Sequence, residues 1–126
     1  MRYDDFIMPF SQGERPLYEV KAGLFKGLSH PFRIRLLELL ADGEEHSVAE
    51  LQEATGLEAS HLSQHLAVLR RHRLVASDRR ASHVYYRLAH ADVAELLAVA
   101  RRLLADIVAA DGARMADVAA LPELPR

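Results

Sequence analysis

The amino-acid sequence contains no cysteine among its 126 residues. Disulfide bonds, thiolate metal ligands and thiol redox switches are therefore excluded within the chain. The sequence also lacks three common catalytic signatures: a Gly-rich phosphate-binding loop, a G-x-S-x-G motif and an H-E-x-x-H motif. These absences argue against an enzyme.

Long hydrophobic runs are absent as well. No apolar stretch approaches the roughly 20 residues of a membrane-spanning helix. The first ten residues place Asp4 and Asp5 ahead of their apolar side chains and contain no apolar core of a signal peptide. The composition, 50% hydrophobic and 27% charged, is that of an ordinary globular domain. We therefore expect a single cytoplasmic domain.

Basic residues are slightly outnumbered by acidic ones overall, but they are concentrated in one segment. The formal net charge is −2. Residues 60–87 contain six arginines and only one acidic residue, Asp78, whereas residues 1–59 contain 6 basic and 11 acidic residues. A basic block in an acidic chain is a local electrostatic feature that attracts phosphate, although a solvated arginine surface would give the same count.

Apolar residues at helical spacing predict two helices near the start of the domain. The first covers about residues 17–29, and the second covers residues 31–42, because a proline at residue 31 starts a helix well. Arg33 and Arg35 on the second helix are interpreted as surface arginines that either reach phosphate or are merely solvated. Residues 44–47 form a connector, for which a very short third strand is the alternative.

A capping box marks the next helix. Ser47 is followed three residues later by Glu50, and Gly56 ends the helix. Residues 57–60 then turn into a further helix. Two helices joined by a short Gly-containing turn form a helix-turn-helix, in which the second helix reads DNA. The inward apolar stripe of this recognition helix is formed by Leu62, Leu66 and Leu69.

Two short runs of alternating polarity, residues 74–78 and 83–88, follow the recognition helix. Residues 79–82, RRAS, lie between them, so the sequence predicts a β-hairpin with an arginine-bearing tip. Tyr85 and Tyr86 alternate across the second strand, and we expect one to be in the core and the other to be exposed. A helix followed by a basic hairpin is typical of a winged helix-turn-helix bound to DNA.

The candidate DNA ligands lie on the front of the recognition helix and at the hairpin tip. Glutamine can bond adenine through two hydrogen bonds, serine can bond base edges or phosphate, and arginine can neutralise phosphate. On and directly after the helix, the candidates are Ser60, His61, Ser63, Gln64, His65, Arg70 and Arg71. At the tip, they are Arg79, Arg80, Ser82 and His83.

Several of these candidates have a second interpretation. His65 either contacts DNA or packs against the hairpin. His61 and His65, four residues apart, could also form a metal pair, but their position on the recognition helix favours a DNA role. At least one of Arg70, Arg71 and Arg73 could serve only to stabilise the helix C-terminus.

The longest helical pattern begins at Ala91 or Asp92 and ends at residues 111–112. Its apolar stripe is wide for a terminal helix, and such a helix is usually covered by a second protomer. We divide the chain into an N-terminal arm (1–16), a DNA-binding and dimerisation domain (17–110) and a C-terminal tail (111–126). A final helical turn over residues 113–121 is an alternative within the tail.

Three stretches resemble the ArsR/SmtB family of winged helix-turn-helix repressors. They are LFKGLSHPFRIRLLELL, SVAELQEATGLEASHLSQHLAVLRRHRLV and SDRRASHVYYRL, and the resemblance covers about residues 20–106. It implies a mainly α (α+β) fold of about five helices with a two-stranded β-hairpin wing. It also implies a cytoplasmic homodimer, formed through the first and last helices, that blocks a promoter and is released by a ligand. The implied dimer residues are Leu17, Val20, Leu24, Val93, Leu96, Leu97, Ala100, Leu104 and Ile107.

Many family members respond to a metal ion, so the resemblance implies positions at which metal ligands would lie. Family sites that use cysteine are excluded here. Aligned on the YYRL sequence, the positions of a last-helix site correspond to His90, Asp92, Leu103 and Asp106. Leucine cannot coordinate a metal, and zinc sites ordinarily have four ligands. We therefore expect no resident metal, with His90, Asp92 and Asp106 as weak candidates.

The leading hypothesis is a dimeric transcriptional regulator that binds double-stranded DNA at an inverted-repeat operator and is released by an unidentified signal. The alternative is a winged-helix module that binds another protein and not DNA. The arginines of the hairpin weigh against this alternative. A small apolar effector between the first and last helices, or no ligand at all, are both compatible with the sequence.

Overall fold

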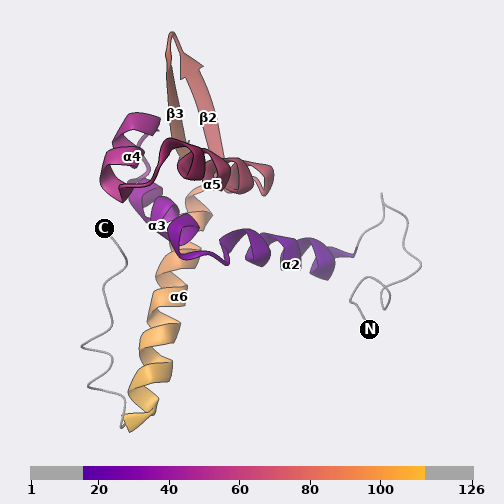
Figure 1. Cartoon of the computed structure of the whole chain (residues 1–126). Coiled ribbons are helices and arrows are strands. Elements are labelled where there is room, and N and C mark those ends of the chain that lie inside the picture. Colours follow the sequence, from indigo (N-terminus) through magenta and orange to yellow (C-terminus); the bar gives the residue numbers. More distant parts are fainter. Residues whose placement is uncertain (1–15, 113–126) are drawn as a thin grey trace.

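A computed structural model describes residues 16–112 of the chain (Figure 1). These residues form five α-helices, one 3-10 helix and three strands. In chain order the elements are α2 (Leu17–Leu28), α3 (Pro31–Leu39), η2 (Leu40–Asp42), β1 (His46–Ser47), α4 (Val48–Thr55), α5 (Ala59–Arg71), β2 (Val75–Arg80), β3 (His83–Leu88) and α6 (Ala91–Ala110). The predicted N-terminal arm up to residue 15, and the helical turn considered for residues 113–121, lie outside the described residues.

The hairpin belongs to a three-stranded antiparallel sheet with the order β1-β3-β2. The very short strand that was the alternative for the connector is present, because His46 pairs with Tyr86 and Ser47 with Tyr85. The sequence predicted a two-stranded wing, and β1 adds a third strand beside the middle of β3. The wing is therefore joined to the segment that leads directly into α4.

The tip of the wing is shorter than predicted. Arg79 pairs with Val84 and Arg80 with His83, so both arginines belong to β2 and not to the loop. Ala81 closes the remaining two-residue loop with a positive φ of 56°. Glycine adopts this conformation most readily. Because no glycine marks the turn, the sequence analysis ended the first strand of the hairpin too early.

The helix-turn-helix itself is confirmed. Ser47 Oγ accepts a hydrogen bond from the Glu50 backbone N–H (3.1 Å), and Glu50 Oε1 accepts one from the Ser47 N–H (2.9 Å), which forms the predicted capping box. Gly56 ends α4 in the left-handed conformation, at φ 71°. The recognition helix α5 begins three residues later, at Ala59.

The two arginines of α3 have structural contacts and are not simply solvated. The Arg35 side chain is only 2% exposed, and its guanidinium donates to the Ala54 carbonyl of α4 at 2.6 Å. Arg33 Nε donates to the Gly27 carbonyl at the end of α2 at 2.7 Å. The interpretation of Arg35 as a surface arginine was therefore wrong, whereas Arg33 is half-buried and bonds the end of α2.

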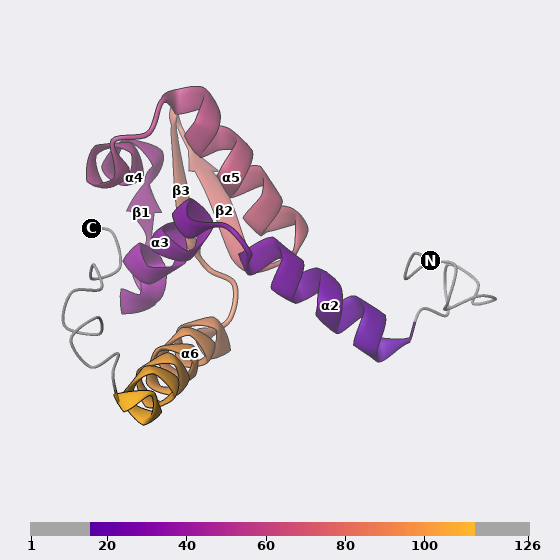
Figure 2. The same ribbon diagram turned by 60° about the horizontal axis from the view of Figure 1, so that its bottom comes forward.

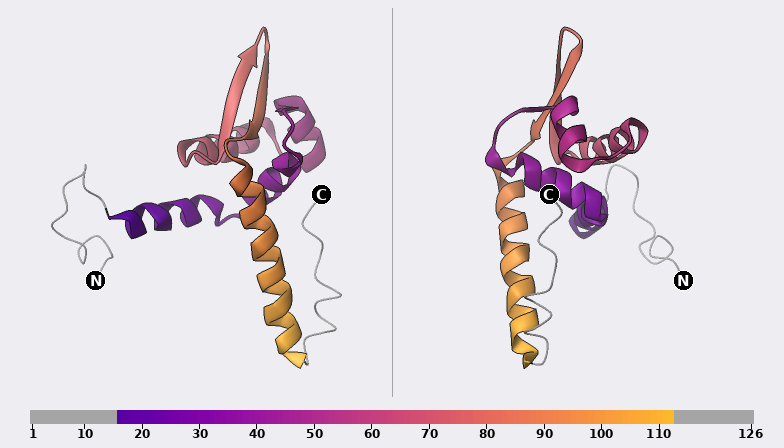
Figure 3. Two further views of the ribbon diagram at one scale, coloured as in Figure 1. Left: turned by 180° about the vertical axis from the view of Figure 1, so that it is seen from behind. Right: turned by 60° about the vertical axis from the view of Figure 1, so that its left-hand side comes forward.

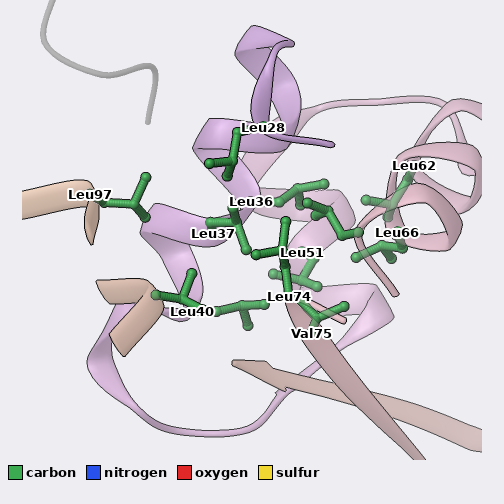
Figure 4. Packing of buried hydrophobic residues seen from close by; sticks show 12 residues of the cluster. Leu28, Leu36, Leu37, Leu40, Leu51, Leu62, Leu66, Leu74, Val75 and Leu97 are labelled. Carbon is green, nitrogen blue, oxygen red and sulfur yellow. The ribbon is translucent and has the colours of Figure 1, made fainter. Parts of the chain in front are cut away.

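The core lies where α3, α4 and α5 meet the base of the wing and the first turns of α6 (Figure 4). It consists almost entirely of leucine, which packs in well-defined rotamers with no polar atom to satisfy. The buried apolar residues are Leu28, Leu36, Leu37, Leu40, Leu51, Leu62, Leu66, Leu69, Leu74, Val75, Val93 and Leu97.

Helices α2 and α6 extend away from this core (Figure 3). Only the last turn of α2 and the first two turns of α6 contribute buried side chains. The remaining apolar residues of both helices are largely exposed. Within residues 16–112, no helix has the length and apolar character needed to cross a membrane.

Candidate nucleic-acid interface

The outer face of α5 carries the polar side chains predicted to contact DNA. Leu62, Leu66 and Leu69 are buried on the inner face, which fixes the rotation of the helix. Helical periodicity then places the intervening residues outward. Ser60, His61, Ser63 and Gln64 are all exposed.

His65 lies at the edge of this face and is half-buried. Its ring packs against the His30 ring, with centroids 4.4 Å apart, and is 6.2 Å from the Phe32 ring. His30 is itself fixed, because its Nδ1 accepts the Phe32 backbone N–H and caps α3. The sequence alternative of packing against the hairpin was therefore wrong, since the contact is with the start of α3.

The pKa of His65 lies below its ordinary value. Burial against these rings disfavours the charged form, and the positive charges of His30, Arg33 and His61 add to the effect. A neutral imidazole at this position can both donate and accept one hydrogen bond.

The two wing arginines face in opposite directions because successive strand residues alternate between faces. Arg79 is opposite Val84, on the same face as the Ser77–Tyr86 pair. Arg80 is opposite His83, on the other face. Ser82 and His83 are exposed at the tip.

Arg80 is held by partners on its own face. Its Nη2 lies 2.6 Å from Glu45 Oε1, and its Nε lies 3.6 Å from Asp78 Oδ2. The guanidinium carbon is 4.1 Å from the centroid of the Tyr85 ring. The contact with Glu45 was missed by the sequence analysis, because 35 residues separate the partners and no motif relates them.

Arg79 instead lines a groove of about 640 Å³ between the wing and α5. Ser63 and Arg70 line the α5 side of this groove, and Ser77 and Tyr86 line the wing side with Arg79. Neither Arg70 nor Arg79 has an ion pair within the part of the chain that the structure describes. The groove therefore presents two uncompensated guanidinium groups beside the exposed face of the recognition helix, which suits a phosphate backbone.

Arg71 does not share this position with Arg70. It lies with Arg73 at the other side of α5, facing α2. Arg73 has a φ of 61°, and the Leu74 N–H donates to the Leu69 carbonyl at 2.9 Å, which closes the C-terminus of α5 as a Schellman motif. The predicted cluster of helix-end arginines is thus divided between two surfaces.

His46 of β1 lies between two carboxylates, those of Asp42 and Glu50. His46 Nε2 lies 2.8 Å from Asp42 Oδ2, and its Nδ1 lies 3.7 Å from Glu50 Oε2. Burial alone would raise the pKa of Asp42, but hydrogen bonds from the Glu44 N–H and from His46 outweigh it and lower the pKa. The Ser47 backbone N–H and hydroxyl lower the pKa of Glu50.

Comparison with known sequences identifies the family. Residues 30–77 match the model described as "Bacterial regulatory protein, arsR family". The HTH-type transcriptional regulator Rv0081 of Mycobacterium tuberculosis is 52% identical over 94 residues, which cover 74% of this chain and 82% of that protein. The chain belongs to the ArsR family of bacterial regulatory proteins.

Solved structures of similar proteins have the same fold as this chain. The crystal structure of M. tuberculosis Rv0081 has a TM-score of 0.71 and 49% identity, and covers 78% of this chain and 98% of that chain. The transcriptional repressor BigR from Xylella fastidiosa has a TM-score of 0.63 and 33% identity, covering 82% and 96%. A homodimeric winged helix-turn-helix DNA-binding domain, Mb0332 from Mycobacterium bovis, has a TM-score of 0.65 and 32% identity, covering 79% and 91%.

The residues implied as the dimer interface of this ArsR-family chain fall into three groups. Val93 and Leu97 are 6% and 7% exposed and pack in the protomer's own core, so they have little surface left for a second copy. Leu24 and Leu96 are partly buried against the same core. The remaining residues are exposed on α2 or α6, and they are Leu17, Val20, Ala100, Leu104 and Ile107.

Among the weak metal candidates, Asp106 is far from His90 and Asp92 within one protomer. Asp92 and Asp106 are separated by 14 residues of continuous helix, which at ~1.5 Å per residue is about 21 Å. His90 precedes the helix as its N-cap. Among the described residues, no three His, Asp or Glu side chains are grouped so that they could hold a metal ion.

Proposed function

We propose that this ArsR-family protein is a dimeric, sequence-specific DNA-binding regulator that represses transcription by occupying an operator, without catalysis. The observation that supports this most directly is the groove between α5 and the wing. It places Arg70 and Arg79, neither of which has an ion pair among residues 16–112, on either side of a groove next to the exposed face of the recognition helix. Its place of action is the cytoplasm.

Within this proposal, the outer residues of α5 enter the major groove. Gln64 and Ser63 are placed to contact base edges, while Ser60 and His61 lie near the helix N-terminus, where base contacts concentrate in helix-turn-helix proteins. Ser82 and His83 at the wing tip contact the neighbouring backbone or minor groove. Arg80 contributes less, because Glu45 and Asp78 already balance its charge.

Dimerisation is supported by the apolar surface of the two projecting helices. Leu103, Leu104 and Ile107 on α6 are 57%, 53% and 57% exposed, and contiguous exposed apolar side chains of this kind mark interaction surfaces. Two copies related by twofold symmetry would present two recognition helices to an inverted-repeat operator. We also propose that DNA release needs no metal bound by the last helix, because Leu103 occupies a ligand position and cannot coordinate.

The test is fluorescence anisotropy of the purified protein on its own upstream intergenic DNA across a salt series. We expect specific binding whose affinity falls steeply as salt rises, with a slope of about −0.9 per neutralised phosphate. The double variant Ser63→Ala/Gln64→Ala should lose the preference over random duplex while keeping salt-dependent non-specific binding. Equal affinity of the wild type for operator and random duplex would contradict the proposal and favour the protein-interaction module.

A further inference from the structure

The recognition helix α5 has a second flank, on the side away from the groove that it forms with the wing. Ser63 lines that groove, and His61 and His65 each lie two residues from Ser63. At about 100° per residue, the two histidines therefore project from the opposite side of the helix. Figure 2 shows the start of α3 beside α5, where the rings of His30 and His65 are in contact. We call this side the α3 flank, and its members are His30, Phe32, Arg33, His61 and His65.

Both flanks of α5 come close to a sugar-phosphate backbone when the helix lies in the major groove of DNA. That groove is about 12 Å wide, and an α-helix with its side chains is about 10–12 Å across. The flank beside the wing then faces one strand with Arg70 and Arg79. The α3 flank faces the other strand, so its charge affects the affinity for DNA.

His65 is the histidine of this flank that is held in place and still open to a ligand. Its ring packs on the rings of His30 and Phe32, and its side chain remains half-buried at the edge of the DNA-facing surface. The Nδ1 atom of His30 accepts the Phe32 backbone N–H at 3.1 Å, and this bond requires an unprotonated Nδ1. Within residues 16–112, no hydrogen bond fixes the protonation state of His65 in this way.

The charged groups that act on His65 are basic. Burial lowers the pKa of His65, because the charged form loses hydration. Positive charge on His30, Arg33 and His61 lowers this pKa further. In the free protein, His65 is therefore a neutral ring at neutral pH, surrounded by groups that carry or can gain positive charge.

The carboxylates of the neighbouring helices lie away from His65. Helix α5 contains no acidic residue, and its exposed N-cap Glu58 is seven residues before His65, which is about 10 Å along the axis. Glu38 lies at the far end of α3, where it is 3.1 Å from Arg101. The charged residue in the last turn of α2 is Lys26, which is again basic. Among residues 16–112, no histidine of the α3 flank has an ion pair, so the flank lacks a negative counter-charge.

We propose that His65 is a further phosphate contact, on the strand across the major groove from Arg70 and Arg79, and that it takes up a proton when DNA binds. This inference rests on the function proposed above. A DNA phosphate supplies the negative charge that the α3 flank lacks, which favours the imidazolium form, and the proton comes from the solvent. The protonated ring then donates a charge-assisted hydrogen bond to a phosphate oxygen. Because binding is linked to proton uptake, the affinity for DNA rises as pH falls.

The test is a set of anisotropy titrations of the full chain on its upstream DNA at about pH 8, 7 and 6, at constant ionic strength. We expect the affinity to be about tenfold higher at pH 6 than at pH 8, within the limit of about tenfold per pH unit for each proton taken up. His65→Gln keeps a hydrogen-bonding side chain that cannot be protonated, and it should lose most of this gain. The matched control His90→Gln, at the N-cap of α6, should keep the gain. Circular dichroism at each pH checks that every protein remains folded.

A measurement on the wild type alone avoids any effect of a substitution on folding. An NMR titration should give a higher pKa for His65 in the DNA complex than in the free protein. An equal or lower pKa in the complex would overturn the proposal. So would a wild-type affinity that does not change with pH, or a His65→Gln protein with the pH dependence of the wild type.

A random duplex separates this contact from the reading of bases. Phosphate contacts carry no sequence information, so the gain in affinity at low pH should also appear on random DNA. A gain confined to the operator would assign His65 to base recognition and overturn the backbone contact. Equal affinity of the wild type for operator and random duplex at every pH would contradict the proposed function. In that case, the pH dependence on random DNA still decides whether His65 contacts phosphate.

Discussion

Arg79 and Arg80 are adjacent in the sequence, yet they lie on opposite faces of the wing. Arg79 shares its face with Val84 and lines the groove beside the recognition helix. Arg80 is 2.6 Å from Glu45 on the other face. The two arginines therefore have different roles. Arg79 is available to a ligand in the groove, whereas Arg80 binds the wing to the connector before β1.

This difference predicts unequal effects on DNA binding. Arg79→Ala should weaken operator affinity about tenfold and reduce the salt slope by about 1, because one phosphate contact is lost. Arg80→Ala should change the affinity by less than about threefold, since its charge is already balanced. Anisotropy titrations at several salt concentrations measure both quantities. Equal losses in affinity and slope for the two variants would contradict the assignment of Arg79 to the groove.

The contact between α2 and α5 predicts opposite effects at two glycines of α2. Gly27→Ala places a Cβ 2.8 Å from the His72 ring and should destabilise the protein by about 1–3 kcal/mol through overpacking. Gly23→Ala meets no atom within 4 Å and should stabilise it by about 0.5–1 kcal/mol through helix propensity. Urea denaturation gives both values. The packing argument would be refuted by a Gly27→Ala protein as stable as the Gly23→Ala protein.

The His65 environment predicts a pH dependence of stability. Because burial and nearby positive charge lower the pKa of His65 from 6.5, the unfolded chain binds a proton at a higher pH than the folded chain does. This contribution to stability is therefore complete above about pH 7 and is lost as pH falls below 6.5. Denaturation between pH 7.5 and pH 5.5 should show the decline, and His65→Gln should reduce it more than His83→Gln, a change at the exposed wing tip. A titration by NMR that put the pKa of His65 above 6.5 would refute this sign.

The exposed stripe of α6 predicts that dimerisation can be separated from folding of the domain. Leu104→Glu and Ile107→Glu lie beyond the residues of α6 that reach the core, so each should leave the helical content of the winged domain in place. Sedimentation velocity should show a shift from dimer to monomer, and operator affinity should fall with it. Arg102→Glu, on the opposite side of α6, is the control and should remain dimeric. Monomeric wild-type protein at micromolar concentration would contradict the interface.

Much of the fold was predictable because its signals are local. The capping box at Ser47 and the helix stop at Gly56 are read from residues within one turn, and the structure confirms both. The exposed polar face of α5 follows from the apolar period alone. The ArsR-family resemblance supplied the order of the elements, which the structure confirms for residues 16–112, and the comparison confirms the family.

The remaining features depend on partners that are distant in the sequence. Arg35 is buried because its guanidinium donates to the Ala54 carbonyl of another helix. The sequence around Arg35 contains no pattern that distinguishes a buried arginine from an exposed one. The direction of Arg80 depends on Glu45, and the position of the turn depends on the backbone of Ala81, where no glycine marks it. His65 packs on α3 because the two helices cross, which periodicity within α5 cannot show.

The pairing of β1 with β3 has a consequence for how an operator is selected. Ser47 belongs both to this sheet and to the cap of α4, so the wing and the helix-turn-helix are joined through one residue. This link restrains the position of the wing relative to the helix-turn-helix. A duplex whose groove width does not match must be deformed on binding. The free-energy cost of this deformation is larger for stiff DNA sequences than for flexible ones. Base pairs that no side chain touches therefore contribute to the choice of site through their flexibility.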